Sequence, residues 1–222
     1  MTQETKVTYA MRRYAAEIFR LQEDVDYVGL TDLAEEVNSS LQAASSMIGR
    51  LKSAGMIEHE PYHGVRLTAA GQTVAMPAIR RHRLAELFLV RQLGFGWDEV
   101  HAITDQFELG INERIEDQID RQLGHPSRCP HGEPIPDKQG RMPDLQDASL
   151  VDLEPGRVYR ISRVREHEPA KLRYLAELKL LPDAVFKLLS FSPFEGPVRI
   201  QIGRDEQVLS YELAASLWVY PA

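Results

Sequence analysis

A proline-rich stretch divides this chain into two parts of different character. The segment from His125 to Asp144, HPSRCPHGEPIPDKQGRMPD, contains five prolines. Proline lacks a backbone N–H and fixes φ, so this segment can form neither a helix nor a central strand. Before it, apolar residues recur at helical spacing; after it, short apolar runs alternate with polar turns. The sequence therefore predicts a helical N-terminal part, a linker and a strand-rich C-terminal part.

The first 70 residues predict short helices followed by a β-ribbon. Apolar residues between Tyr14 and Gln22 share one helix face. Thr31 is expected to cap a short helix, and Gly55 to end the helix that begins at Leu41. MIEHE and VRLT, joined by PYHG, resemble two strands around a tight turn. This order is typical of a winged helix-turn-helix, with an ordinary helical hairpin as the alternative.

In a winged helix the second helix of the pair would be the recognition helix. Its outward residues are mostly small and polar, which suits close approach to a DNA groove. The residues expected to contact DNA are Ser39, Ser40, Gln42, Ala43, Ser45, Ser46 and Arg50.

Three helices are predicted next, over about Ala69 to Leu93, Asp98 to Leu109 and Ile111 to Leu123. Pro77 would kink the first of them. Their faces are too apolar for three lone helices, so we expect a homodimer interface to bury them. The segment from residue 81 to 124 is also acidic, with five Lys/Arg against nine Asp/Glu.

The C-terminal part predicts a small β-barrel of the SH3-like sort, interrupted by the helix AKLRYLAELKLL. The expected fold is mainly α with small β parts. The expected boundaries are a winged helix domain over 1–70, a helical domain for dimerisation and metal binding over 71–124, a proline-rich linker over 125–147 and an SH3-like domain over 148–222.

Composition limits the cellular setting. No run of 18 apolar residues and no signal-like N-terminus occur, so no membrane association is expected. The single cysteine, Cys129, fits a reducing cytoplasm. A net charge of −7 argues against a protein that coats nucleic acid through charge alone.

Histidines and carboxylates at helical spacing predict a metal site. His82 and Glu86 are four residues apart, and His101, Asp105 and Glu108 share one face of the following helix. Three buried anions would repel one another unless a cation neutralised them. Nitrogen and oxygen ligands without a thiolate suit Mn²⁺ or Fe²⁺.

The alternative to a metal site is a salt-bridged surface helix, with Arg81, Arg83 and Arg91 as partners. Cys129 and His131 have the C-x-H spacing of a metal pair, but we interpret that segment as a structural turn. Four other histidines have no partner at convincing spacing: His59, His63, His125 and His167.

HRLAELFL, the His101 segment, CPHGEPIP and the preceding winged helix together resemble the diphtheria toxin repressor family. The resemblance covers nearly the whole chain. It implies a metal-dependent transcriptional regulator that binds a double-stranded DNA operator as a homodimer, with no organic cofactor. It also implies three domains: the winged helix, a helical dimerisation domain and an SH3-like, FeoA-type domain.

By this resemblance, His82, Glu86 and His101 occupy the family's ancillary metal site. Glu168 falls on a C-terminal glutamate ligand, whereas the accompanying glutamine position holds Lys171. Glu166 and His167 are neighbours that could take part instead.

Asp105 and Glu108 match two ligands of the family's primary site. Three other expected ligand positions hold Leu109, Arg13 and Ala16. Arg13 pairing with Asp105 or Glu108 would be a tether that needs no metal.

The function expected is regulation of metal-ion homeostasis by a metal-dependent DNA-binding protein, with manganese favoured over iron and no enzymatic activity. One alternative is a metal-independent DNA-binding regulator whose metal site has decayed. The other is a carboxylate/His metallohydrolase. The absence of a nucleophile motif and of a phosphate-loop motif from the sequence counts against it.

Overall fold

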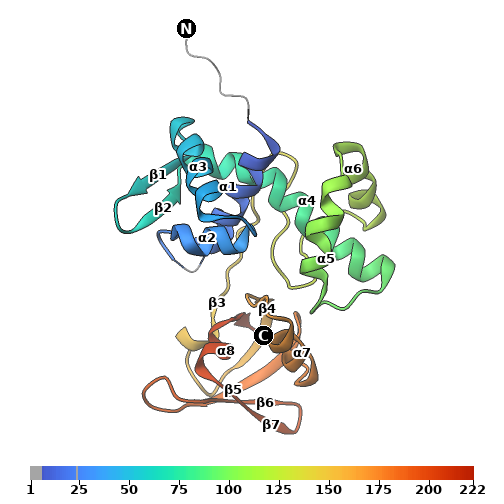
Figure 1. Ribbon diagram of the computed structural model, residues 1–222. Helices are drawn as coiled ribbons and strands as arrows, with labels where there is room; N and C mark the ends of the chain where they lie inside the picture. The colour runs from blue at the N-terminus through green and yellow to red at the C-terminus, as the bar shows by residue number, and fades with distance from the viewer. Residues whose placement is uncertain (1–6, 24) are drawn as a thin grey trace. The chain divides into compact units, whose positions relative to one another are not determined.

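The computed structural model describes residues 7–23 and 25–222, which form two compact units (Figure 1). One unit holds the residues up to Arg81 together with Pro136–Arg141. The other holds His82–Ile135 and Met142–Ala222. The long helix α4 (Ala69–Leu93), with Pro77 inside it, contributes residues to both.

The first unit is a winged helix-turn-helix, as the sequence predicts. An antiparallel ribbon follows three helices, and Ile57 pairs with Leu67 across it. Met11, Ile18, Leu33, Leu51 and Val65 fill its interior, each at most 1% exposed. Its elements are α1 (Tyr9–Leu21), α2 (Leu30–Glu36), α3 (Leu41–Ser53), β1 (Ile57–Glu60), β2 (Gly64–Leu67) and the first turns of α4.

The helix ends in this unit follow the capping rules with one exception. Ser40 accepts a hydrogen bond from the backbone N–H of Ala43 at 3.2 Å, and Gly55 follows α3 with φ of +69°. The prediction that Thr31 caps α2 is wrong. Gly29 occupies the N-cap position in an extended conformation without a side-chain cap, so Thr31 lies within the first turn.

The helical part of the second unit contains the end of α4, α5 (Val100–Phe107), a short 3-10 helix (Glu108–Gly110) and α6 (Glu113–Gln122). Asn112 caps α6 by accepting the N–H of Ile115 at 3.0 Å. A buried apolar cluster holds these helices together: Leu84, Ala85, Leu87, Ile111, Ile119 and Ile135.

The C-terminal part of this unit is a six-stranded antiparallel sheet with two helices, α7 (Pro169–Glu177) and α8 (Tyr211–Ala215). Bulges between Ile161 and Arg163 and between Leu188 and Ser190 interrupt its register, and bulges bend sheets locally. The strand order is β3 (Ala148–Ser149), β8 (Leu217–Pro221), β4 (Val158–Val164), β5 (Val185–Phe191), β6 (Val198–Ile202) and β7 (Asp205–Leu209).

The prediction of an SH3-like barrel is met only in part. Among the described strands, β3 and β7 lie at opposite ends of the order, so the sheet does not close. Helix α8 was not anticipated from the sequence. Over the described residues, no helix is long and apolar enough to cross a bilayer.

Candidate metal centre

Helix α4 places His82 and Glu86 in the interior of the second unit. Each residue is 3% exposed, and His82 Nε2 lies 3.3 Å from Glu86 Oε1. Their neighbours Leu84, Ala85 and Leu87 are buried too, so this stretch of α4 is enclosed by its surroundings. The two side chains therefore lie in the interior. The surface-helix alternative would require them to lie on a solvated face.

Helix α5 adds His101 to this pair. Its Nδ1 lies 3.1 Å from Glu86 Oε1 and 3.2 Å from His82 Nε2. One donor atom from each of the three residues falls within 4.8 Å of the others. The structure thus brings together the three residues that helical spacing and the family resemblance both single out.

Asp105 and Glu108 lie on the other side of His82. The Nδ1 atom of His82 is 3.0 Å from Glu108 Oε2 and 3.8 Å from Asp105 Oδ1. The 3-10 turn that continues α5 carries Glu108, whose side chain is 12% exposed, whereas that of Asp105 is 40% exposed. His82, Asp105 and Glu108 form a second group able to hold a metal ion.

A third group contains two residues that the sequence reading set aside. Cys129 and His131 are buried beside Glu86, and the three offer donor atoms within 4.8 Å of one another. The segment is indeed a turn, because Gly132 N–H donates to Cys129 O at 3.0 Å. The same turn directs a thiol and an imidazole at the carboxylate. The C-x-H spacing of Cys129 and His131 was the sequence signal that could have indicated this group.

A backbone contact sets which nitrogen of His131 faces Glu86. His131 Nε2 lies 2.7 Å from the carbonyl oxygen of Trp97, to which it can only donate. His131 Nδ1 lies 3.8 Å from Glu86 Oε2. A carbonyl oxygen that accepts from the other ring nitrogen is how proteins orient a ligating histidine.

The electrostatics of this cluster centre on Glu86. Burial alone would raise the pKa of Glu86, but His82, His101 and His131 outweigh it and hold that pKa well below its usual range. Burial would lower the pKa of His131, yet Cys129 and Glu86 raise it well above the usual value. Burial raises the pKa of Cys129, and the charge of Glu86 adds to this. Glu86 is therefore ionised, the form that binds cations.

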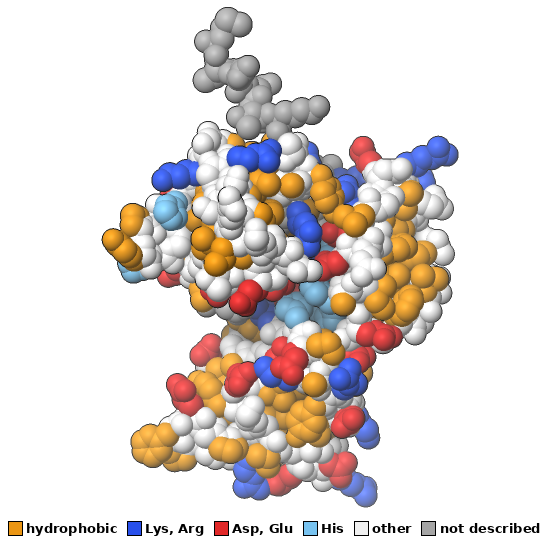
Figure 2. Space-filling view, in the orientation of Figure 1, with side chains coloured by type: hydrophobic (Ala, Val, Ile, Leu, Met, Phe, Trp, Pro, Cys, Tyr) orange, Lys and Arg blue, Asp and Glu red, His pale blue; other side chains and the backbone are white. Residues whose placement is uncertain are grey.

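His167, from the C-terminal part of the unit, also approaches the cluster. Its ring centroid lies 5.0 Å from that of His101 and 6.3 Å from that of His131. No sequence spacing relates His167 to these residues, but it was one of the two C-terminal neighbours expected to be able to take part at the site. Figure 2 shows a group of histidine side chains near the centre of the face in view, besides others at its left edge.

Glu168, the other C-terminal residue expected at the site, is in none of the three groups. Its carboxylate is 3.6 Å from the ammonium of Lys171, which also lies 3.1 Å from Glu166 and 2.7 Å from Glu212. Hydrogen bonds that Lys171 donates to Glu212 and Glu166 raise the pKa of Lys171. The lysine that replaces the family's glutamine thus holds the nearby acids itself.

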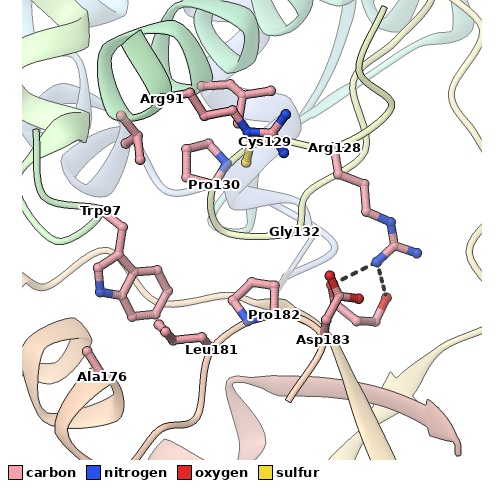
Figure 3. A pocket seen from close by; sticks show the side chains of 13 residues that line it. Arg91, Trp97, Arg128, Cys129, Pro130, Gly132, Ala176, Leu181, Pro182 and Asp183 are labelled. Atoms are coloured by element: carbon pink, nitrogen blue, oxygen red, sulfur yellow. Dashed lines mark hydrogen bonds between the residues drawn. The ribbon is translucent and has the colours of Figure 1, made fainter. Parts of the chain in front are cut away.

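A cavity of about 460 Å³ borders the Cys129 side of the cluster (Figure 3). Trp97, Pro130 and Pro182 line it. At its edge Arg128 Nη1 donates to the carbonyl oxygen of Ser162 at 2.8 Å and to its hydroxyl at 3.1 Å. These bonds attach the start of the Cys129 turn to strand β4.

The residues expected to contact DNA lie in the first unit. Ser39 is half-buried and hydrogen-bonds to the Tyr14 hydroxyl at 2.9 Å, and Ser40 caps α3, so both have structural roles. The remaining five are exposed on α3: Gln42, Ala43, Ser45, Ser46 and Arg50. A tether from Arg13 to Asp105 or Glu108 stays a prediction.

Three family models match successive parts of the chain. The N-terminal DNA binding domain of iron dependent repressors matches residues 6–65, and their metal binding and dimerisation domain matches residues 68–137. The FeoA domain matches residues 148–221.

Curated relatives and solved structures agree with these matches. The iron-dependent repressor IdeR of Mycobacterium tuberculosis is 28% identical over 93% of this chain and 94% of its own length. The diphtheria toxin repressor of Corynebacterium diphtheriae is 29% identical over 55% of this chain and 54% of its own.

A manganese-dependent transcriptional repressor in complex with manganese is 32% identical, with a TM-score of 0.87 over 96% of this chain and 100% of that one. The crystal structure of T. acidophilum IdeR is 29% identical, with a TM-score of 0.84 over 98% of this chain and all of that one. These relatives are transcriptional repressors rather than enzymes, which excludes the metallohydrolase alternative. The chain belongs to the diphtheria toxin repressor family of metal-dependent transcriptional repressors.

Proposed function

We propose that this protein is a metal-dependent transcriptional repressor that binds operator DNA as a homodimer and controls genes of metal-ion homeostasis in the cytoplasm. The observation that carries the proposal is the buried cluster around Glu86, in which His82 and His101 lie within 3.3 Å of its carboxylate. Its relatives include iron-dependent and manganese-dependent repressors.

The donor set fits a divalent cation. Glu86, Asp105 and Glu108 bring three carboxylates to one region, and like charges in a buried site disfavour their common ionisation. A bound divalent ion supplies the positive charge that offsets them. His82 with Asp105 and Glu108 would hold one ion.

Glu86 with Cys129 and His131 would hold a second ion, and His101 Nδ1 lies 3.1 Å from Glu86 Oε1 and 3.2 Å from His82 Nε2. The thiol of Cys129 changes the argument about metal identity. Carboxylates suit Mn²⁺ and imidazoles also suit Fe²⁺ and Zn²⁺, whereas a thiolate is a softer ligand that shifts preference further toward Fe²⁺ and Zn²⁺. Manganese remains the first choice at His82, Asp105 and Glu108, and iron is an equal candidate at Cys129.

Helix α4 provides the physical link between metal binding and DNA binding. His82 and Glu86 lie on its C-terminal part, and its first turns belong to the unit that carries the recognition helix α3. Ligands from α4, α5 and the Cys129 turn become fixed together when they share a cation. Metal activates DNA binding if the DNA-competent arrangement binds the cation more tightly than the alternative arrangements do.

The metal-independent alternative draws support from Leu109, which is 64% exposed where the family has a histidine ligand. Cys129 and His131 supply further donors at the separate group around Glu86, which Leu109 does not affect. A titration of DNA binding with Mn²⁺, Fe²⁺, Zn²⁺ and a chelator tests the two readings. Affinity that rises with metal and falls with chelator supports the proposal, and affinity indifferent to both contradicts it.

An apolar surface on the helical part of the second unit supports homodimerisation. Phe88 and Phe107 stack with ring centroids 6.1 Å apart, and Ile115 beside them is 41% exposed. Figure 2 shows hydrophobic side chains collected on the flank where Figure 1 places α6. Leu93 and Leu109 are exposed by more than half. Burial of such a patch is what a symmetric interface achieves.

Changing Ile115 to Glu should convert the protein to a monomer at micromolar concentration. A charge placed in the apolar patch loses its hydration when the interface forms, which opposes association. Sedimentation velocity measures the change. Val208→Glu is the matched control, because Val208 is 56% exposed on β7 and outside the patch. A dimeric Ile115→Glu protein would place the interface elsewhere.

Changing Arg50 to Ala should weaken operator binding by about 1–3 kcal/mol, because an exposed arginine on a recognition helix contacts phosphate or a guanine edge. DNA selected by the wild-type protein from a random pool is the probe, read by fluorescence anisotropy. Lys52→Ala controls for charge, since residues two apart do not share a helix face. Equal losses of operator affinity in both variants would indicate nonspecific electrostatic binding. Unchanged affinity in Arg50→Ala would contradict the assignment of α3 as the recognition helix.

A further inference from the structure

Glu133 is a buried carboxylate close to the metal cluster but outside all three candidate groups. It is 6% exposed and lies between two guanidinium groups. Arg83 Nη2 on α4 is 3.2 Å from Glu133 Oε2, and Arg163 Nη1 on β4 is 3.3 Å from the same oxygen. Glu133 therefore joins the helix that carries His82 and Glu86 to the C-terminal sheet.

Both arginines are themselves anchored. Arg83 Nη1 donates to the carbonyl oxygen of Pro134 at 2.6 Å. Arg163 pairs with Asp147 at 3.1 Å, and its guanidinium carbon lies 4.5 Å from the ring centroid of Trp218. The position of Glu133 is thus fixed from two sides by side chains that have little freedom to move.

The turn that holds Cys129 and His131 depends on the same contacts. The backbone N–H of Cys129 donates to Glu133 O at 2.9 Å, and Val164 N–H on β4 donates to His131 O at 2.8 Å. Glu133 closes the turn through its backbone and anchors it through its side chain. Where Cys129 and His131 lie relative to Glu86 therefore depends on the Arg83–Glu133–Arg163 link.

We propose that Glu133 is a positioning residue through which the C-terminal domain sets metal affinity at the Cys129–His131 group. The inference rests on the proposed function, since it concerns metal binding there. The acids that this domain could offer as ligands, Glu166 and Glu168, are bound to Lys171. The domain acts instead by holding the turn that carries the thiol and the imidazole.

Substitution Glu133→Gln in the full-length protein tests this role, because it keeps the side-chain shape and removes the charge. Co²⁺ is the probe, and its thiolate charge-transfer absorption reports coordination by Cys129. Loss of an outer-shell contact typically costs 10–100-fold in metal affinity. We expect the Co²⁺ affinity measured by this band to fall by about 10–100-fold. The affinity measured by calorimetry at the group of His82, Asp105 and Glu108 should be unchanged. Glu206→Gln, which breaks the exposed pair with Arg199, should leave both unchanged.

Two further variants separate positioning from general destabilisation. If Glu133 acts through Arg163, the effects of Glu133→Gln and Arg163→Gln on Co²⁺ affinity should be non-additive in the double variant. Glu133→Asp keeps the charge and should recover part of the lost affinity. Urea unfolding of the metal-free proteins measures any structural contribution separately.

The outcomes distinguish the positioning role from the metal assignment beneath it. A wild-type charge-transfer band with unchanged band and affinity in Glu133→Gln overturns the positioning role alone. Equal losses at both metal groups, in proportion to lost stability, overturn it as well. A wild-type protein without the band overturns the positioning role together with the Cys129 group of the proposed function.

Discussion

Replacing His82 and Glu86 together by Ala should abolish metal-stimulated DNA binding. Each of the three candidate groups among the described residues contains at least one of these two residues, so none of the three keeps its full donor set. The loss should exceed the roughly 10–100-fold that removal of an outer-shell contact costs. Calorimetric titration with Mn²⁺, beside anisotropy with wild-type-selected DNA, measures both effects.

The matched control replaces a histidine and a glutamate outside the cluster. His125→Asn with Glu177→Ala removes the same two residue types, and both positions are exposed. This control should keep the wild-type metal response. If the His82/Glu86 variant also keeps it, the cluster is not the sensor. If it binds DNA tightly without metal, the cluster has a repulsive role that metal relieves.

Changing Gly132 to Ala should disrupt the turn that carries Cys129 and His131. A Cβ at this position would lie 2.2 Å from the carbonyl oxygen of Ser162 and 2.7 Å from Arg163 Cα, both backbone atoms of β4. The φ of +87° adds strain of about 1–3 kcal/mol for a non-glycine residue. We expect a large loss of stability by urea unfolding and loss of the Co²⁺–thiolate band.

Gly156→Ala separates the steric clash with β4 from the backbone strain of a positive φ. Gly156 has a φ of +91°, but a Cβ there would meet nothing within 4 Å. It should therefore show the backbone strain alone and keep the thiolate band. Equal destabilisation by the two substitutions would mean that β4 does not restrict the turn as the structure indicates.

Local patterns predict most of the helices because each depends on neighbours in the sequence. The stop at Gly55 and the stripe that makes α3 follow from periodicity and capping. The start of α2 does not follow from these rules, because its N-cap residue is Gly29, which has no side chain to cap the helix. The prediction had placed the cap at Thr31 because its hydroxyl could serve as one. Closure of the sheet was also beyond local patterns, because it depends on pairing between strands far apart in the chain.

The candidate site also contains residues that local spacing predicts and residues that only the fold brings together. His82, Glu86 and His101 could be found because helical spacing puts residues on one face. Cys129, His131 and His167 meet the cluster from a turn and from another domain, so no spacing relates them to Glu86. Glu168 stays a prediction that rests on its match to a family position, and in the structure its carboxylate lies 3.6 Å from the ammonium of Lys171.

Proline inside α4 has a mechanical consequence. The helix has 25 residues and is about 37 Å long at 1.5 Å per residue. Pro77 has no N–H to donate to the carbonyl of residue 73, so the rod is weakest in bending there. The candidate ligands His82 and Glu86 follow that point, and the DNA-binding unit includes α4 from Ala69 through Pro77 to Arg81. A bend at Pro77 would therefore reorient the C-terminal part of α4, which carries His82 and Glu86, relative to the first turns of the same helix.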